Sequence, residues 1–129
     1  MEIVIRKAEP KDVPAIMGLV RELALFEKAP EEVVNTEEKM LQDGFGAHPA
    51  FQAFVAEDNA TSTVVGICLY YTAYSTWKGK YYFLDDIVVT EQYRQFGIGR
   101  KLMNAFLKAA KENLKEFSNN FSEKKQTDN

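Results

Sequence analysis

The chain has 129 residues, 46% hydrophobic and 27% charged, which is the mix of one soluble globular domain rather than of a disordered or fibrous protein. Its net charge of −3 argues against a general nucleic-acid-binding protein, because such proteins normally carry a basic face. One cysteine, Cys68, and one histidine, His48, exclude an internal disulfide and argue against a metal site. No apolar run approaches the roughly 20 residues that cross a bilayer, and the first ten residues make a poor signal peptide. We therefore expect a cytoplasmic protein that binds no nucleic acid, membrane or metal.

The first part of the chain predicts one strand and two helices. Residues 2–7 alternate charged and β-branched side chains, which is typical of a strand. Asp12 is a suitable N-cap, and the apolar spacing that follows predicts a helix over about 13–27. A second, shorter helix is predicted from an N-cap at Thr36 to Gln42, where a glycine-rich turn follows.

The middle of the chain predicts three strands. Residues 51–57, 64–74 and 80–89 are rich in aromatic and β-branched side chains. The loops 58–61 and 75–79 between them are short enough for antiparallel hairpins.

A helix with a broad apolar face follows the last of these strands. Its main apolar face is formed by Ile98, Leu102, Ala105, Phe106 and Ala109. A face of this width predicts burial against the sheet. The predicted order is βααβββα. We assign residues 1–113 to one domain and residues 114–129 to a polar tail, solvated and frayed.

The segment between the last strand and this helix is the most informative one. It reads Arg94-Gln95-Phe96-Gly97-Ile98-Gly99, and its two glycines allow positive φ angles and close backbone approach. The helix that starts here presents unpaired N–H groups and the positive end of its dipole, which together favour an anion such as a pyrophosphate. The alternative is that the glycines only shape a tight turn between strand and helix.

An acidic segment lies between the first strand and the hairpins. Residues 22–43 contain seven acidic side chains and two basic ones, Lys28 and Lys39. Such a segment either forms a solvated surface or attracts a cationic amine.

Two carboxylates, Asp85 and Asp86, lie inside an apolar strand, where burial without a partner is costly. Because adjacent strand residues point to opposite faces, we expect at most one of them to face a given cleft. A buried carboxylate that hydrogen-bonds loop amides for structural reasons is the alternative.

These features together resemble a known family. The order βααβββα, with Arg94-x-x-Gly97-x-Gly99 after the fourth strand, resembles the GNAT superfamily of acetyl-CoA-dependent N-acetyltransferases, and within it the diamine (spermidine/spermine) acetyltransferase branch. The segments that carry the resemblance are 21–27, 43–49, 70–71, 74–80, 84–86 and 93–99. The resemblance spans roughly residues 3–111. It implies an α/β (α+β) GNAT fold with a mixed, mostly antiparallel sheet flanked by helices.

The resemblance also implies site residues. The acetyl-CoA-binding residues it implies are Ile87, Val88, Val89, Arg94, Gln95, Phe96, Gly97, Ile98, Gly99 and Arg100. The first three would offer backbone groups to the pantetheine arm and the thioester carbonyl, and the others would wrap the pyrophosphate. Phe26 and Glu27 would contact a polyamine or similar amine. Asp85 stands where the family carries a glutamate, so we expect it to bind the amine and to help remove its proton.

The chain departs from the family pattern at two places. Ser75 stands where the family has an acidic residue in the loop before Trp77. The family continues past the glycine-motif helix with a fifth strand, a helix carrying a tyrosine that protonates the leaving thiolate, and two more strands, whereas no tyrosine follows Tyr93 here. We therefore expect a shortened member that lacks the C-terminal strands, leaves the strand 80–89 as an exposed edge, and forms a homodimer.

The function implied by the resemblance is transfer of acetyl from acetyl-CoA, as co-substrate, to a primary amine of a small cationic substrate. The amine would be a polyamine, a diamine or a thialysine-like compound. The alternative is an inactive module that binds acetyl-CoA or forms dimers. A third hypothesis is that the basic helix binds a different anion.

Overall fold

The computed structural model describes residues 1–114, and its elements follow the order βααβββα predicted from the sequence. The strands and helices are β1 (Ile3–Lys7), α1 (Val13–Phe26), α2 (Glu37–Phe45), β2 (Gln52–Asp58), β3 (Thr63–Ser75), β4 (Gly79–Val89) and α3 (Ile98–Asn113). Three short 3-10 turns connect them: η1 (Pro10–Asp12), η2 (Pro30–Glu32) and η3 (Glu91–Tyr93). The predicted polar tail lies outside the described residues, apart from Leu114.

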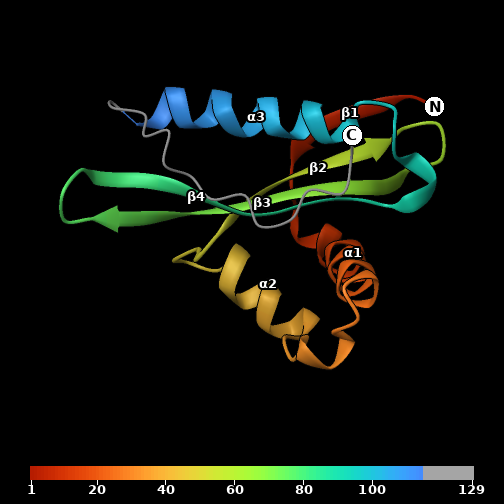
Figure 1. The fold of residues 1–129 in the computed structure, drawn as a ribbon, viewed down its shortest axis with the longest axis horizontal. Coiled ribbons are helices and arrows are strands. Elements are labelled where there is room, and N and C mark those ends of the chain that lie inside the picture. The colour runs from red at the N-terminus through yellow and green to blue at the C-terminus, as the bar shows by residue number, and fades with distance from the viewer. Residues whose placement is uncertain (115–129) are drawn as a thin grey trace.

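The four strands form one sheet in the order β1-β2-β3-β4. Both predicted hairpins are present, and all three strand pairings among residues 1–114 are antiparallel, so the mixed pairing that we expected is not seen there. Figure 1 shows α3 lying along one face of the sheet, with α1 and α2 on the opposite face. β1 and β4 are the two edge strands of the described sheet.

The sheet separates two hydrophobic cores. On one side, Ile98, Leu102 and Phe106 of α3 are fully buried, which confirms the predicted packing of this helix against the sheet. On the other side, Ile16 and Met17 of α1 are fully buried against the opposite faces of the same strands. The division follows from the alternation of side chains along each strand. None of the described helices is long and apolar enough to cross a membrane.

Helix α2 starts where predicted but ends later. The Thr36 hydroxyl accepts a hydrogen bond from the Lys39 amide at 3.1 Å, which confirms Thr36 as the N-cap. The helix continues through Gly44 to Phe45 because the Phe45 ring packs edge-on against Phe51, with centroids 6.2 Å apart. A Cβ at Gly44 would overlap the Phe51 ring, so glycine permits this close approach. Tertiary packing here outweighs the helix-breaking tendency of glycine.

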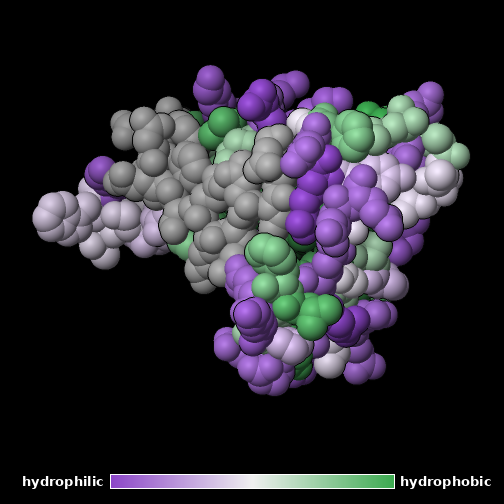
Figure 2. All heavy atoms as spheres, turned by 45° about the vertical axis from the view of Figure 1, so that its right-hand side comes forward, coloured by the Kyte–Doolittle hydropathy of each residue, from purple (hydrophilic) through white to green (hydrophobic). Residues whose placement is uncertain are grey.

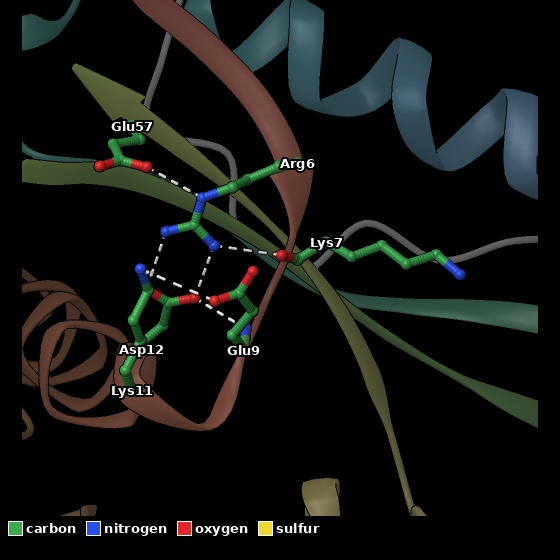
Figure 3. A network of polar contacts seen from close by, with 6 residues as sticks. All are labelled: Arg6, Lys7, Glu9, Lys11, Asp12 and Glu57. Carbon is green, nitrogen blue, oxygen red and sulfur yellow. Dashed lines mark hydrogen bonds and ion pairs between the residues drawn. The ribbon is translucent and has the colours of Figure 1, made fainter. Parts of the chain in front are cut away.

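A partly buried ion-pair network joins β1, β2 and the start of α1 (Figure 3). Arg6 donates to both carboxylate oxygens of Asp12, at 2.8 and 3.0 Å, and to Glu57 at 2.9 Å. Asp12 occupies the predicted N-cap position, but its side chain makes no capping bond to α1 and instead accepts from Arg6 and from the Glu9 amide. Burial opposes ionisation of Asp12, yet these donors hold its pKa below the ordinary value. The network ties β1 and β2 to the start of α1.

Candidate active site

A β-bulge in β4 places Asp85 and Asp86 together. Leu69 of β3 pairs with Asp86 and Tyr70 pairs with Leu84, so Asp85 has no opposite residue in the register. A bulge of this kind interrupts the alternation of side chains between the two faces. Both aspartates consequently line the same open cavity of about 400 Å³. Our expectation that at most one of them would face a given cleft is therefore wrong.

The cavity has an apolar floor and an acidic rim. Val20, Leu23 and Ala24 of α1, with Ala29 and Val33, supply the apolar lining. The acidic side chains are Glu27, Glu32, Asp85 and Asp86, and no basic side chain lines it among the described residues. These carboxylates do not form a compact metal cluster, since no group of three metal-binding side chains occurs in residues 1–114. The arrangement favours an organic cation with a short apolar stem.

Two of the three residues predicted to contact an amine, Phe26 and Glu27, are neighbours in the sequence but differ in their surroundings. Glu27 lines the cavity, whereas Phe26 does not and is 68% exposed. Leu25 and Val34, which lie on the same side of the sheet, are also exposed. Figure 2 shows a hydrophobic patch bordered by hydrophilic residues on the lower part of the molecule, where α1 and α2 lie.

The end of β4 directs part of its backbone toward the open edge of the sheet. The Thr90 amide donates to the Val65 carbonyl of β3 at 2.9 Å, and Val88 pairs with Ile67 two residues earlier. Because antiparallel pairs alternate, the peptide groups of Val88 face β3 while those of Ile87 and Val89 point away from it. Of the three predicted backbone contacts, Ile87 and Val89 are therefore well oriented. The backbone contact that we expected of Val88 is not supported, because its N–H and C=O groups face the neighbouring strand, β3.

The loop between β4 and α3 contains two left-handed residues. Gly97, the N-cap of α3, has φ +78°, which confirms the expected positive φ at this glycine. The second left-handed residue is Gln95, with φ +70°, rather than Gly99, which lies buried in the first turn of α3. Left-handed residues next to a helix start turn successive backbone N–H groups toward one concave surface. Gly97 provides no capping side chain for the first amides of α3.

Basic side chains surround the same helix start. Arg100 and Lys101 lie in the first turn of α3 and are exposed to solvent. Their charge adds to the positive end of the helix dipole. The backbone and the charge of this segment therefore both favour an anion.

The Arg94 side chain takes a different direction from the one expected of a pyrophosphate ligand. Its Nε donates to the Val89 carbonyl at 2.9 Å, and its Nη2 lies 3.5 Å from a Glu22 carboxylate oxygen. The guanidinium carbon is 5.9 Å from the centroid of the Phe26 ring, within the range of a cation–π contact. In this structure the Arg94 side chain joins α1 to the end of β4.

Asp58, the last residue of β2, anchors the same loop through Tyr93. It accepts hydrogen bonds from the Glu2 amide at 3.0 Å, the Ala60 amide at 3.1 Å and the Tyr93 hydroxyl at 2.9 Å. Hydrogen bonds from the Glu2 amide and the Tyr93 hydroxyl lower the pKa of Asp58. The hydrogen bond between Tyr93 and Asp58 also raises the pKa of Tyr93.

Several contributing residues were not singled out from the sequence. Glu32 and Glu22 belong to the predicted acidic segment, but nothing in its composition distinguished them from their neighbours. The alternation rule allowed only one of Asp85 and Asp86 on a given cleft, and the resemblance pointed to Asp85, so Asp86 was not singled out; the bulge breaks that rule. Asp58 and Tyr93 are 35 residues apart, and no local pattern signals their contact.

Comparison with known proteins identifies the family of the chain. The model of the acetyltransferase (GNAT) family matches residues 19–123. Thialysine N-epsilon-acetyltransferase of Mus musculus is 44% identical over 112 residues, covering 82% of this chain and 66% of that protein. The corresponding protein of Caenorhabditis elegans is 35% identical over 105 residues, covering 80% and 62%. The chain therefore belongs to the acetyltransferase (GNAT) family, and it spans about two thirds of the length of these relatives.

Solved structures confirm the fold. An aminoglycoside acetyltransferase from an uncultured soil metagenomic sample, in complex with sisomicin, matches with a TM-score of 0.69 at 20% identity, covering 98% of this chain and 78% of that one. A possible acetyltransferase from Clostridium difficile 630 matches with a TM-score of 0.72 at 19% identity, covering 100% and 81%. The predicted GNAT architecture is thus confirmed.

Proposed function

We propose that this protein transfers the acetyl group of acetyl-CoA to a primary amine of a small cationic substrate, of the polyamine, diamine or thialysine-like class. The observation that carries the proposal is the bulge in β4, which places Asp85 and Asp86 on one acidic cavity directly before the segment that carries the outward-facing peptide groups of Ile87 and Val89. The names of the relatives, which include thialysine N-epsilon-acetyltransferase and a spermidine/spermine N(1)-acetyltransferase-like protein of Homo sapiens, support this substrate class.

The acidic cavity is the proposed amine site. Glu27, Asp85 and Asp86 attract the charged substrate, and the apolar floor accommodates its methylene groups. Phe26 lies outside the cavity, so its proposed role is to border the approach to it. From Asp86 to Val89 the strand advances by about 10 Å, at roughly 3.3 Å per residue, which brings the amine site close to the end of β4.

The loop and the start of α3 are the proposed site for the co-substrate. Backbone amides from Gln95 to Arg100 hold the pyrophosphate, assisted by the helix dipole. The outward peptide groups of Ile87 and Val89 bind the pantetheine arm, and one N–H acts as a donor to the thioester oxygen.

The proposed reaction is direct attack by a neutral amine. The amine nitrogen forms a bond to the thioester carbonyl carbon, the carbon–sulfur bond breaks, and the thiolate leaves with the coenzyme. The ammonium form first gives one proton to the carboxylate of Asp85, directly or through one water, and the second proton, lost from nitrogen as the amide forms, passes to the leaving thiolate. A cationic substrate must lose a proton before it reacts, so a carboxylate on the cavity serves both binding and proton removal.

We also propose that two copies associate. β4 is an edge strand of the described sheet, and exposed strand edges are usually paired or covered in native proteins. The proposed contact uses the first half of β4, residues 79–84, and leaves the edge at Ile87 and Val89 to the co-substrate. Light scattering after size exclusion is expected to give twice the mass of one chain, and a monomer mass over the full concentration range would refute the dimer.

The proposed activity is tested by thiol release from acetyl-CoA. Thialysine, spermidine and lysine are offered in turn, with a reaction without amine as the blank. We expect at least one amine to raise the rate above the blank, and the rate to fall in Asp86→Asn. Binding of CoA in calorimetry with no turnover on any amine would instead favour a non-catalytic binding module.

A further inference from the structure

A single carboxylate on α1 holds the segment that leads into the proposed pyrophosphate loop. One oxygen of Glu22 accepts a hydrogen bond from the Thr90 hydroxyl at 2.8 Å, and the other accepts from the Glu91 amide at 3.1 Å. The second oxygen also lies 3.5 Å from Nη2 of Arg94. Glu22 thus contacts three residues of a five-residue segment that lies 68 or more positions away in the sequence.

Arg94 extends these contacts to both proposed substrate sites. Its Nε hydrogen-bonds the carbonyl of Val89, a proposed acetyl-CoA contact. Its guanidinium lies over the ring of Phe26, at the border of the amine site. The side chains of Glu22 and Arg94 are only 32% and 21% exposed, so solvent screens their interaction less than that of a surface pair.

The loop needs such an anchor because of its backbone. Gln95 follows Arg94 directly and adopts φ +70°, a conformation that costs a non-glycine residue about 1 kcal/mol and persists only where its surroundings impose it. The residues before it are held by Glu22 on one side and by the Tyr93–Asp58 hydrogen bond on the other. The backbone that leads into the strained residue, Gln95, is therefore held in place by both contacts.

We infer that Glu22 is a positioning residue for acetyl-CoA binding, which fixes the segment from Thr90 to Arg94 and holds the Arg94 side chain as a structural link rather than as a phosphate ligand. The inference rests on the proposed function. Arg94 then contributes to binding by shaping the loop, and the backbone amides that follow it contact the pyrophosphate.

This inference makes a prediction opposite in sign to simple electrostatics. Glu22 is an acidic group close to a site for an anionic ligand, so removing its charge should strengthen CoA binding if Glu22 acted only through its charge or if it competed with phosphate for Arg94. A positioning residue gives the reverse result, because its loss lowers the fraction of molecules whose loop is competent to bind.

The experiment measures CoA dissociation constants by calorimetry for the wild type, Glu22→Gln, Thr90→Val and the double variant. Glu38→Gln is the matched control, since Glu38 is exposed and lies on α2, outside both proposed sites. A fall of the competent fraction to about a tenth raises the dissociation constant about tenfold, which is the result expected for Glu22→Gln. Thr90→Val is expected to weaken binding by a smaller factor, and the double variant by less than the product of the two factors because both remove the same contact.

Further measurements separate positioning from loss of fold. Urea unfolding and far-ultraviolet circular dichroism are expected to show each variant folded under the conditions of titration. In the assay, Glu22→Gln is expected to raise KM for acetyl-CoA while kcat at saturating acetyl-CoA stays within a factor of about two. Unchanged or tighter CoA binding by folded Glu22→Gln, with the wild type binding, overturns the inference alone. No CoA binding by the folded wild type overturns the proposed function and the inference with it.

Discussion

The left-handed Gly97 offers a direct way to place a charge at the proposed pyrophosphate site. Gly97 has φ +78°, and a Cβ built on it meets no heavy atom within 4 Å outside its chain neighbours. Asn and Asp tolerate this backbone conformation better than other non-glycine residues. Gly97→Asn and Gly97→Asp therefore form a matched pair that differs in charge and hardly in shape. Both are expected to lose about 1 kcal/mol of stability relative to the wild type.

The difference between the two variants gives the electrostatic effect on binding. Taking about 6 Å between the new carboxylate and each of two phosphate charges, and an effective dielectric constant of about 40, the repulsion is about 1.4 kcal/mol per charge. Salt at physiological strength, with a Debye length of about 8 Å, reduces the sum by roughly half. About 1.5 kcal/mol remains, which corresponds to a roughly tenfold weaker affinity for Gly97→Asp than for Gly97→Asn.

Calorimetric titration with CoA measures this difference, and urea unfolding checks that both variants are folded under the conditions of titration. Repeating the titration at 1 M salt is expected to bring the two affinities closer together, because the Debye length falls to about 3 Å. Equal CoA affinities of the two variants at low salt would falsify the placement of the pyrophosphate at the start of α3.

Three further perturbations test other parts of the structure. Asp86→Asn is expected to raise KM for the amine about tenfold while KM for acetyl-CoA changes little, because Asp86 lines the proposed amine cavity; equal changes in both constants would contradict that assignment. Asp58 has a pKa below its ordinary value of 3.8, so its contribution to stability is complete above that value and is lost as pH falls through the lowered pKa. Asp58→Asn should therefore flatten the acid limb of a plot of unfolding free energy against pH, and a parallel limb would count against the hydrogen bonds described. Phe106→Ala is expected to cost about 3–5 kcal/mol in urea unfolding, because this ring is fully buried between α3 and the sheet, and a loss below about 1 kcal/mol would refute that packing.

Local patterns predicted most of the fold. The apolar spacing of Ile98, Leu102 and Phe106 identified the buried face of α3, and the aromatic and β-branched segments identified three strands to within one residue of their ends. These signals depend only on the period of the secondary structure, which each segment carries in itself. The positive φ of Gly97 was also predictable from the local sequence, because a glycine before a helix permits a backbone conformation that few other residues adopt.

The features that shape the site depend on distant partners. The bulge at Asp85 depends on how β4 pairs with Leu69 and Tyr70 of β3. A shift of one residue in this pairing would change the face of the sheet to which the carboxylates of Asp85 and Asp86 point. The contact between Glu22 and Thr90 spans 68 positions, so the sequence of neither segment indicates it. Gly44 was read as a helix end, but the ring of Phe51 packs against it and the helix continues. In each case tertiary contacts override a correct local rule.

A crystal structure with acetyl-CoA bound tests the central claim most directly. We expect the pyrophosphate oxygens to lie about 3 Å from backbone nitrogens between Gly97 and Arg100, with the thioester beside the edge of β4 near Val89. An ordered coenzyme whose pyrophosphate occupies another surface, while the loop before α3 keeps the conformation described, would contradict it.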